Sequence, residues 1–378
     1  MKLEFFSHLN HNEGHVSSVL SMSKTQLWEQ LKNTRLSEIR NIIPTSCYEK
    51  SFQTAIFWLI FDVIAFSGGL VLVFSTHLIS LKLLGSSISG IATAMLFVWG
   101  HDAAHGTLFS SNRLAEVLGT IAMLPSLNMY RHWSYGHNKV HHGFTSLTPI
   151  DWIWRPLSPK AYLALNQFQK LFYRVERSLT GSALHYLRKV WWDGMIKFNP
   201  GADKADQKQY YRNGKMISLI YAVMMGLLGY FFSGGILGIV FVVIVPFVIF
   251  NYFIAIIVYL HHTHPDLPFF DIKQKWSHSV GFVYCSTIIH CSKLWKMLLH
   301  NIMVHIPHHL DIRIPFYHLP EAYTEIKKSY GKYIKEYDFS WREVRQIFCE
   351  CKLYDFEKNC WLTFKELKNL NLTPEKST

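Results

Sequence analysis

Four long apolar runs, separated by polar segments, set the overall pattern of the chain. They cover residues 54–76, 83–100, 216–232 and 236–260, and a short Ser-Gly-Gly turn separates the last two. A helix that spans a membrane needs about 20 predominantly apolar residues, whereas a soluble helix of this length keeps a polar face. The pattern therefore predicts an all-α, polytopic membrane protein with four transmembrane helices.

The polar segments predict further helices at the membrane surface. Residues 114–130 are apolar, but Glu116 and Pro125 interrupt them, and we expect an interfacial or re-entrant helix there. Residues 143–214 are rich in Trp, Tyr and Arg, as expected of amphipathic helices at the level of the lipid headgroups. We divide the chain into a cytoplasmic N-terminal segment (1–50), a membrane domain (51–330) and a cytoplasmic, helical C-terminal tail (331–378).

Lysine and arginine are nearly absent from the two stretches of the chain that contain the apolar runs. Lys82 is the only one between Lys50 and Arg113, and there is none between Lys215 and Lys273. Positive residues stay on the cytoplasmic side of a membrane, so we expect two helical hairpins that cross and return beneath a cytoplasmic, histidine-rich cap. The formal net charge of +12 has the same origin. Such a charge also suits nucleic-acid binding, but no motif supports it, and we expect no nucleic-acid partner.

Histidines gather in short clusters that follow the apolar runs. Imidazoles three or four residues apart share one face of a helix, and neutral imidazole is a common ligand of transition metals. Ten of them on one membrane face are enough for a two-metal site. The alternative is that they are headgroup-facing polar residues at helix ends. The clusters are His101 and His105; His137, His141 and His142; His262 and His264; and His305, His308 and His309.

The ligand type narrows the choice of metal. No glutamate lies in these clusters, although soluble di-iron proteins use Glu and His together, so histidine would carry the whole site. Imidazole favours iron over calcium or magnesium, while zinc stays open. Asp102 and Asp151 are candidates to orient a ligand imidazole through its second nitrogen. Asp102 could equally cap a helix or pair with a cation, and Asp151 could simply start a helix.

Two other positions are notable. Asp62 lies inside the first apolar run, where a carboxylate is costly and must face protein or water; we assign it no role. Pro307 lies inside the last histidine cluster and would distort a regular helix there. The histidines without paired spacing are expected to be structural or interfacial; they are His132, His278, His290 and His300.

Four sequence runs resemble a known family. GHDAAHGTLF, GHNKVHHGFT, LHHTHPDLPFFD and HIPHHLDIRIPFYHLPEA are similar to the three histidine boxes and flanks of membrane fatty acid desaturases, most of all the acyl-lipid omega-6 (Δ12) branch. The resemblance runs in order from the first apolar run to about Tyr330. It implies that the eight histidines of the three boxes are metal ligands. It implies one more ligand after the fourth run, where the spacing to Asp271 favours His262 over His264.

The resemblance also implies an activity. Two iron ions and O2 as co-substrate would remove hydrogen from a long-chain fatty acyl group, in a lipid or in acyl-CoA, and leave a cis double bond. Neither a fused cytochrome b5 signature nor a flavin-type glycine motif is visible. Electrons are therefore expected from an external ferredoxin or cytochrome b5. The site would lie on the cytoplasmic face of the bacterial cytoplasmic membrane or of the eukaryotic endoplasmic reticulum.

Two alternatives remain. A fatty acyl or carotenoid hydroxylase or ketolase shares the boxes, and only the Δ12-like flanks favour a desaturase. A non-catalytic membrane protein that binds haem or transports metal is the second alternative. A metal transporter needs polar or ionisable groups deep in its helices, and apart from Asp62 and Asn251 the apolar runs offer few.

Overall fold

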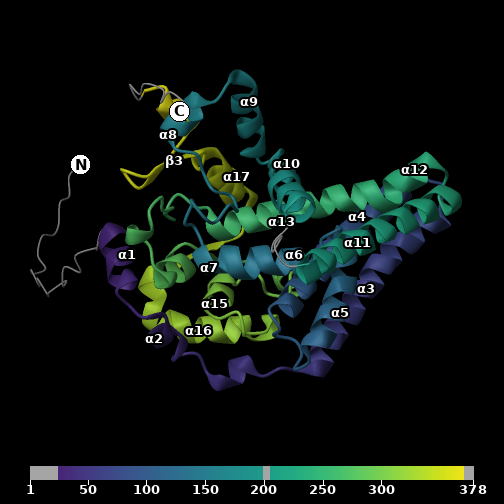
Figure 1. The fold of residues 1–378 in the computed structure, drawn as a ribbon, viewed down its shortest axis with the longest axis horizontal. Helices are drawn as coiled ribbons and strands as arrows, with labels where there is room; N and C mark the ends of the chain where they lie inside the picture. Colours follow the sequence, from purple (N-terminus) through teal and green to yellow (C-terminus); the bar gives the residue numbers. More distant parts are fainter. Residues whose placement is uncertain (1–23, 199–204, 370–378) are drawn as a thin grey trace, which may run out of the picture.

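The computed structural model describes residues 24–198 and 205–369, and long helices dominate it (Figure 1). Within these residues, four helical segments are long and apolar enough to cross a membrane by length and composition, as the apolar runs predicted. They lie side by side, and the shorter elements gather at one end of them. The expected segments 1–50 and 331–378 are described only in part. The four are α3 (Phe52–Ser75), α4 (Ile79–Ala104), α11 (Ala205–Phe232), and α12 (Ile236–Ile239) continued through the π-helix η5 (Val240–Ile244) into α13 (Val245–His262).

Small residues allow the long helices to approach closely. A Cβ atom on Gly69 of α3 would lie 2.6 Å from the carbonyl oxygen of Gly85 in α4. In the same way, a Cβ atom on Gly238 of α12 would clash with the carbonyl group of Gly229 in α11. Close backbone approach is how helices pack in lipid, where the hydrophobic effect does not drive them together.

Lys82 joins the two pairs of helices at the end opposite the histidines. Its Nζ donates hydrogen bonds to the carbonyl oxygens of Val73 (3.1 Å) and Ser233 (2.9 Å), and its side chain is buried. Val73 lies in the last turn of α3 and Ser233 directly follows α11. The ammonium group therefore satisfies carbonyls at two helix C-termini, where four such groups have no partner within the helix.

Short helices form the other end of the molecule. α5 has 12 residues, too few for a span, and packs against α4. Val117 and Ile121 are exposed on its outer face, as expected of an amphipathic helix. The short helices are α1 (Lys24–Lys32), α2 (Leu36–Arg40), η1 (Thr45–Tyr48), α5 (Asn112–Met123), η2 (Leu124–Ser126), α6 (Tyr130–Ser134), η3 (Tyr135–His141), α7 (His142–Phe144), α8 (Pro159–Ala164), α9 (Gln167–Glu176), α10 (Ser182–His185), η4 (Tyr186–Lys197), η6 (Lys273–Lys275), η7 (Val280–Tyr284), α14 (Lys293–Leu298), α15 (His305–Leu310), η8 (Phe316–His318), α16 (Leu319–Tyr330), η9 (Gly331–Tyr333), α17 (Trp341–Glu350) and α18 (Phe364–Leu367).

Two small sheets correct the all-helical expectation for this end. β1 (Thr287–His290) pairs in parallel with β2 (Lys335–Asp338), with Thr287 opposite Lys335. β3 (Leu353–Asp355) and β4 (Cys360–Leu362) form an antiparallel pair. Strands of three or four residues are too short for periodicity to reveal. Because β2 is hydrogen-bonded to β1, the C-terminal segment is joined to the core beside the third histidine box, which comprises His305, His308 and His309.

Candidate metal centre

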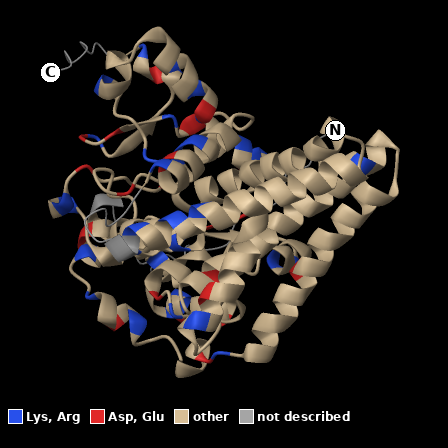
Figure 2. Cartoon of the chain, turned by 45° about the vertical axis from the view of Figure 1, so that its right-hand side comes forward, with Lys and Arg blue, Asp and Glu red and all other residues tan. Residues whose placement is uncertain are grey.

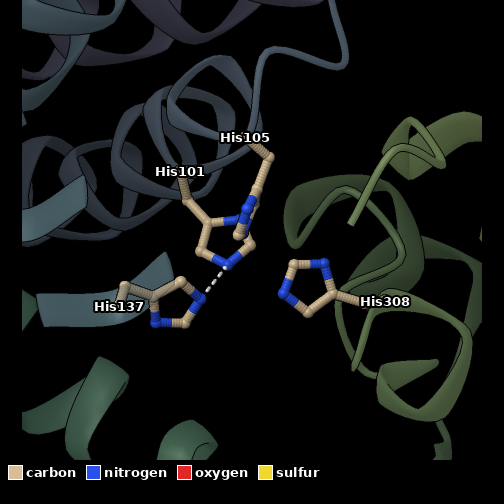
Figure 3. A group of neighbouring side chains, drawn as sticks. All are labelled: His101, His105, His137 and His308. Atoms are coloured by element: carbon tan, nitrogen blue, oxygen red, sulfur yellow. Dashed lines mark hydrogen bonds between the residues drawn. The ribbon is translucent and has the colours of Figure 1, made fainter. Parts of the chain in front are cut away.

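Four histidines from three segments meet where α4 ends (Figure 3). His101 lies in the last turn of α4 and His105 directly follows it, while His137 comes from η3 and His308 from α15. One ring nitrogen from each of the four lies within 4.8 Å of the others. In this first group, His101 Nε2 and His137 Nε2 lie 3.0 Å apart.

A second group forms where α13 ends. It consists of His141 from η3, His262 from α13, and His305 and His309 from α15, all buried. The Nε2 atom of His262 is 3.1 Å from the Nε2 atoms of both His141 and His305. The Nε2 atoms of His305 and His309 are 3.0 Å apart.

His142 lies between the groups, and His264 lies outside both. The Nε2 atom of His142 is 3.0 Å from that of His137 and 3.1 Å from that of His308, and its ring stacks on His309. By contrast, the two ring nitrogens of His264 are 3.5 Å from carboxylate oxygens of Asp266 and Glu343. The structure thus brings together nine of the ten predicted histidines and leaves His264 apart.

Local helix geometry explains how the boxes converge. His101 and His105 are four residues apart and share a face of α4. His137 and His142 are five apart, which in an α-helix places them about 140° from one another. The π-helical turn of η3 brings them to the same side. Pro307 lies in the first turn of α15, where its missing N–H has no intrahelical acceptor to lose, so α15 forms despite it.

Both predicted aspartates contact a candidate ligand. Asp102 Oδ1 is 3.0 Å from His101 Nδ1, and Asp151 Oδ2 is 3.1 Å from His141 Nδ1. A carboxylate accepts, so each histidine donates from Nδ1 and turns an Nε2 lone pair toward its group. Asp151 also accepts the N–H of Ser146 at 3.0 Å, which holds the carboxylate in place.

Sequence reasoning missed two further contacts of this kind. Thr145 donates its hydroxyl hydrogen to the carbonyl of His141 (2.8 Å), so its oxygen can accept from His309 Nδ1 at 3.2 Å. His262 Nδ1 donates to the carbonyl oxygen of Cys285 at 3.2 Å. The sequence does not reveal that a particular backbone carbonyl or threonine contacts a histidine, because only the fold brings them together.

Electrostatics favour neutral rings at six of these histidines. Burial, reinforced by neighbouring histidines, lowers the pKa of His105, His137 and His142 well below the ordinary value of 6.5. The same cause lowers the pKa of His305, His308 and His309. Neutral imidazole is the form that binds metals.

The donor atoms fit two transition-metal ions. Histidine nitrogens bind zinc at about 2.0–2.1 Å, so two of them at 90–109° on one ion lie roughly 2.9–3.4 Å apart. The close pairs in both groups, at 3.0–3.1 Å, fall in that range. Neither group includes a carboxylate, which argues against calcium or magnesium.

An apolar cavity borders both groups. Its volume is about 60 Å³, which gives room for only a short apolar segment, since complete small-molecule sites enclose roughly 300–1,000 Å³. His101 and His137 of the first group line it, as do His141, His262 and His305 of the second. Apolar side chains from α4, η4 and α13 form most of its other walls. An apolar ligand in this cavity would therefore lie against both candidate metal positions.

Comparison with known proteins identifies the family. The family model described as fatty acid desaturase matches residues 79–341. An sn-1 oleoyl-lipid 12-desaturase of Picosynechococcus sp. is 30% identical over 352 residues, which cover 89% of this chain and 95% of that protein. The chloroplastic omega-6 fatty acid desaturase of Arabidopsis thaliana is 29% identical over 339 residues, covering 88% and 73%. These matches confirm the resemblance carried by the histidine boxes, and the chain belongs to the fatty acid desaturase family.

Proposed function

We propose that this enzyme uses O2 to introduce a cis double bond at the Δ12 (omega-6) position of long-chain fatty acyl groups in membrane lipids. Family membership supports the reaction class, and relatives named oleoyl-lipid 12-desaturase and omega-6 desaturase support the position and the lipid substrate. The observation that carries the proposal is the apolar cavity that borders both histidine groups.

We assign the histidines as ligands of two ions. His142 would complete the first group, and the remaining ligands are His101, His105, His137 and His308 for one ion and His141, His262, His305 and His309 for the other. Two iron ions held there would supply the redox chemistry that activates O2 for cleavage of a C–H bond. Asp102 and Asp151 would fix the rings of His101 and His141.

The walls of the cavity would position the substrate. They hold an acyl methylene against the histidines and keep water away. An acyl chain carries no charge near the reacting carbons, so selectivity must come from the length and shape of the cavity. Trp152 lines this cavity and also a second, outer hollow beside Lys189 and Phe198. We place the route of the acyl chain past its indole ring.

Charge supports the orientation in the membrane. Lysine, arginine and the acidic residues gather over the short elements, and the long helices are almost bare of them (Figure 2). We propose that the helices form two hairpins and that the histidine end faces the cytoplasm, where an external ferredoxin or cytochrome b5 delivers electrons. The basic character of the chain suits an acidic carrier. The membrane would be the cytoplasmic one in a bacterium or the endoplasmic reticulum in a eukaryote.

The test is the fatty-acid profile of a host that expresses the chain. Wild type should yield a new dienoic acid with a cis Δ12 double bond, located by gas chromatography and mass spectrometry. A double His141→Ala, His142→Ala variant should yield none, while His264→Gln, outside both groups, should keep the product. Hydroxylated or keto products would instead support a hydroxylase or ketolase. Purified wild-type protein without iron would refute the assigned centre.

A further inference from the structure

Asp62 of α3 forms a buried contact with His300, in the turn that leads into the third histidine box. We propose that Asp62 and His300 are positioning residues. They fix the third box (His305, His308 and His309) relative to the first (His101 and His105) and so determine the geometry of the metal centre. The inference rests on the proposed function, because the two histidine groups are taken there as metal ligands.

The contact joins two segments far apart in the sequence. His300 Nε2 lies 2.7 Å from Asp62 Oδ2, and both side chains are fully buried. A carboxylate accepts, so the imidazole donates from Nε2. An aspartate in an apolar helix is costly unless a polar group pairs with it, and His300 is the partner that the structure provides. Trp58 and Phe316 contact the imidazole ring edge-on or at a tilt and confine it.

The turn at His300 has an unusual backbone. His300 and the next residue, Asn301, both have positive φ angles, 46° and 56°. Two consecutive non-glycine residues in the left-handed region persist only where surrounding contacts hold them. Asp62 holds the first. Asn301 donates from Nδ2 to the carbonyl oxygen of Phe316 at 3.2 Å. Its backbone N–H donates to the carbonyl oxygen of Lys296 at 2.9 Å.

This turn fixes the start of α15. Three residues after Asn301, Val304 pairs with Ile288 of β1, and α15 begins at His305. α15 carries His308 of the first group and His305 and His309 of the second. A shift of the turn would therefore displace ligands of both ions together.

The same turn is linked to the first box through Phe316. The carbonyl of Phe316 accepts from Asn301, and its N–H donates to Asp102 Oδ2 at 2.7 Å. Asp102 in turn holds His101 Nδ1 at 3.0 Å. A continuous series of contacts thus runs from α3 through the turn to a ligand on α4, and none of its members before His101 touches the cavity.

Metal binding by the purified full-length protein tests the inference. Asp62→Leu removes the acceptor, whereas Asp62→Asn keeps an oxygen that can accept from His300. The probes are iron content per chain and the visible spectrum of the cobalt(II)-loaded protein, which reports ligand geometry without turnover. We expect Asp62→Leu to lose at least half of the bound metal and to change the cobalt spectrum, and Asp62→Asn to restore both.

Two controls separate positioning from simple loss of stability. Val73→Ala removes buried volume from the far end of α3 and should lower the melting temperature without changing the cobalt spectrum. If Asp62→Leu does not fold, Asn301→Gly replaces it, because glycine adopts the positive φ but cannot reach Phe316. An altered cobalt spectrum in Asn301→Gly supports the inference.

Two outcomes would overturn the inference that Asp62 and His300 position the third box. One is full metal content with a wild-type cobalt spectrum in Asp62→Leu, and the other is the same result in Asn301→Gly. If wild type itself binds no metal, the proposed function fails before this question arises.

Discussion

Each imidazole of the two groups turns one nitrogen toward its neighbours, and in four of them an oxygen atom holds the other nitrogen. The oxygens belong to Asp102, Asp151, Thr145 and the backbone of Cys285. Such contacts fix the tautomer and the ring orientation, and a ring that is already oriented loses little freedom when it binds a metal.

Removing one of these oxygens should weaken the binding of one metal ion more than the binding of the other. Asp151 contacts His141, which belongs to the second group only. We expect Asp151→Ala to lower the affinity of one of the two metal positions by about 10–100-fold, the usual effect of losing such a contact. Metal titration of the purified protein measures it, with exposed Asp271→Ala as the matched control. Equal weakening of both positions would contradict the assignment of His141 to one group.

The histidines should also make the metal-free protein sensitive to acid. Burial holds the pKa of His137, His142, His305 and His308 below 6.5 in the folded state. The unfolded chain therefore takes up protons near pH 6.5 that the folded chain does not. The stabilising contribution is complete above that pH and falls on acidification, by up to about 1.4 kcal/mol per pH unit for each group.

The melting temperature of metal-free protein should consequently be constant near pH 7.5 and decline from about pH 6.5 downward. Protein loaded with metal should begin its decline at a lower pH, because bound ions compete with protons for the same nitrogens. A melting temperature that stays level from pH 7.5 to 5.5 without metal would show that these rings are not held neutral.

At the scale of elements, the cavity depends on the π-helix η4 and its contact with Trp152. A Cβ atom on Gly194 of η4 would lie 3.3 Å from the indole ring, so a larger side chain must push the ring or block the space beside it. We expect Gly194→Val to reduce product formation by at least tenfold while iron content stays normal. Gly226→Val is the matched control, because nothing lies within 4 Å of a Cβ atom there. Loss of iron in Gly194→Val would indicate a folding defect.

The elements also show what the sequence could and could not predict. Long apolar runs and histidines four residues apart are local sequence patterns that do not depend on which segments pack together. The four long helices and the pairing of His101 with His105 could therefore be predicted. The π-turn that aligns His137 with His142 has no such period. The strands β1 and β2 pair residues that are 48 apart in the sequence, and the contact of Asp62 with His300 joins residues 238 apart. Such pairings depend on the completed fold.

At the scale of the whole molecule, Lys82 joins the α3–α4 pair of long helices to the α11–α12 pair, at the end opposite the two histidine groups. At 1.5 Å per residue, Lys82 lies roughly 28 Å along α4 from His101. Lys82→Met should leave the carbonyls of Val73 and Ser233 without this donor. Hydrogen bonds to a charged group contribute about 1.5–3 kcal/mol. We therefore expect a lower melting temperature in detergent with unchanged iron content. Altered metal binding would show that the far end of the bundle is coupled to the centre.

The distribution of the histidines over the chain has a consequence for biosynthesis. Each group takes histidines from η3 and from α15, and α15 comes after the last long helix. With the ligands assigned as proposed, a nascent chain lacks a complete set for either site until residues 308 and 309 have left the ribosome, after all four long helices have been made. Metal loading is then a late step, and a partly made chain cannot hold a reactive iron centre in the membrane. The order of the boxes along the chain would thus delay O2 chemistry until the surrounding cavity exists.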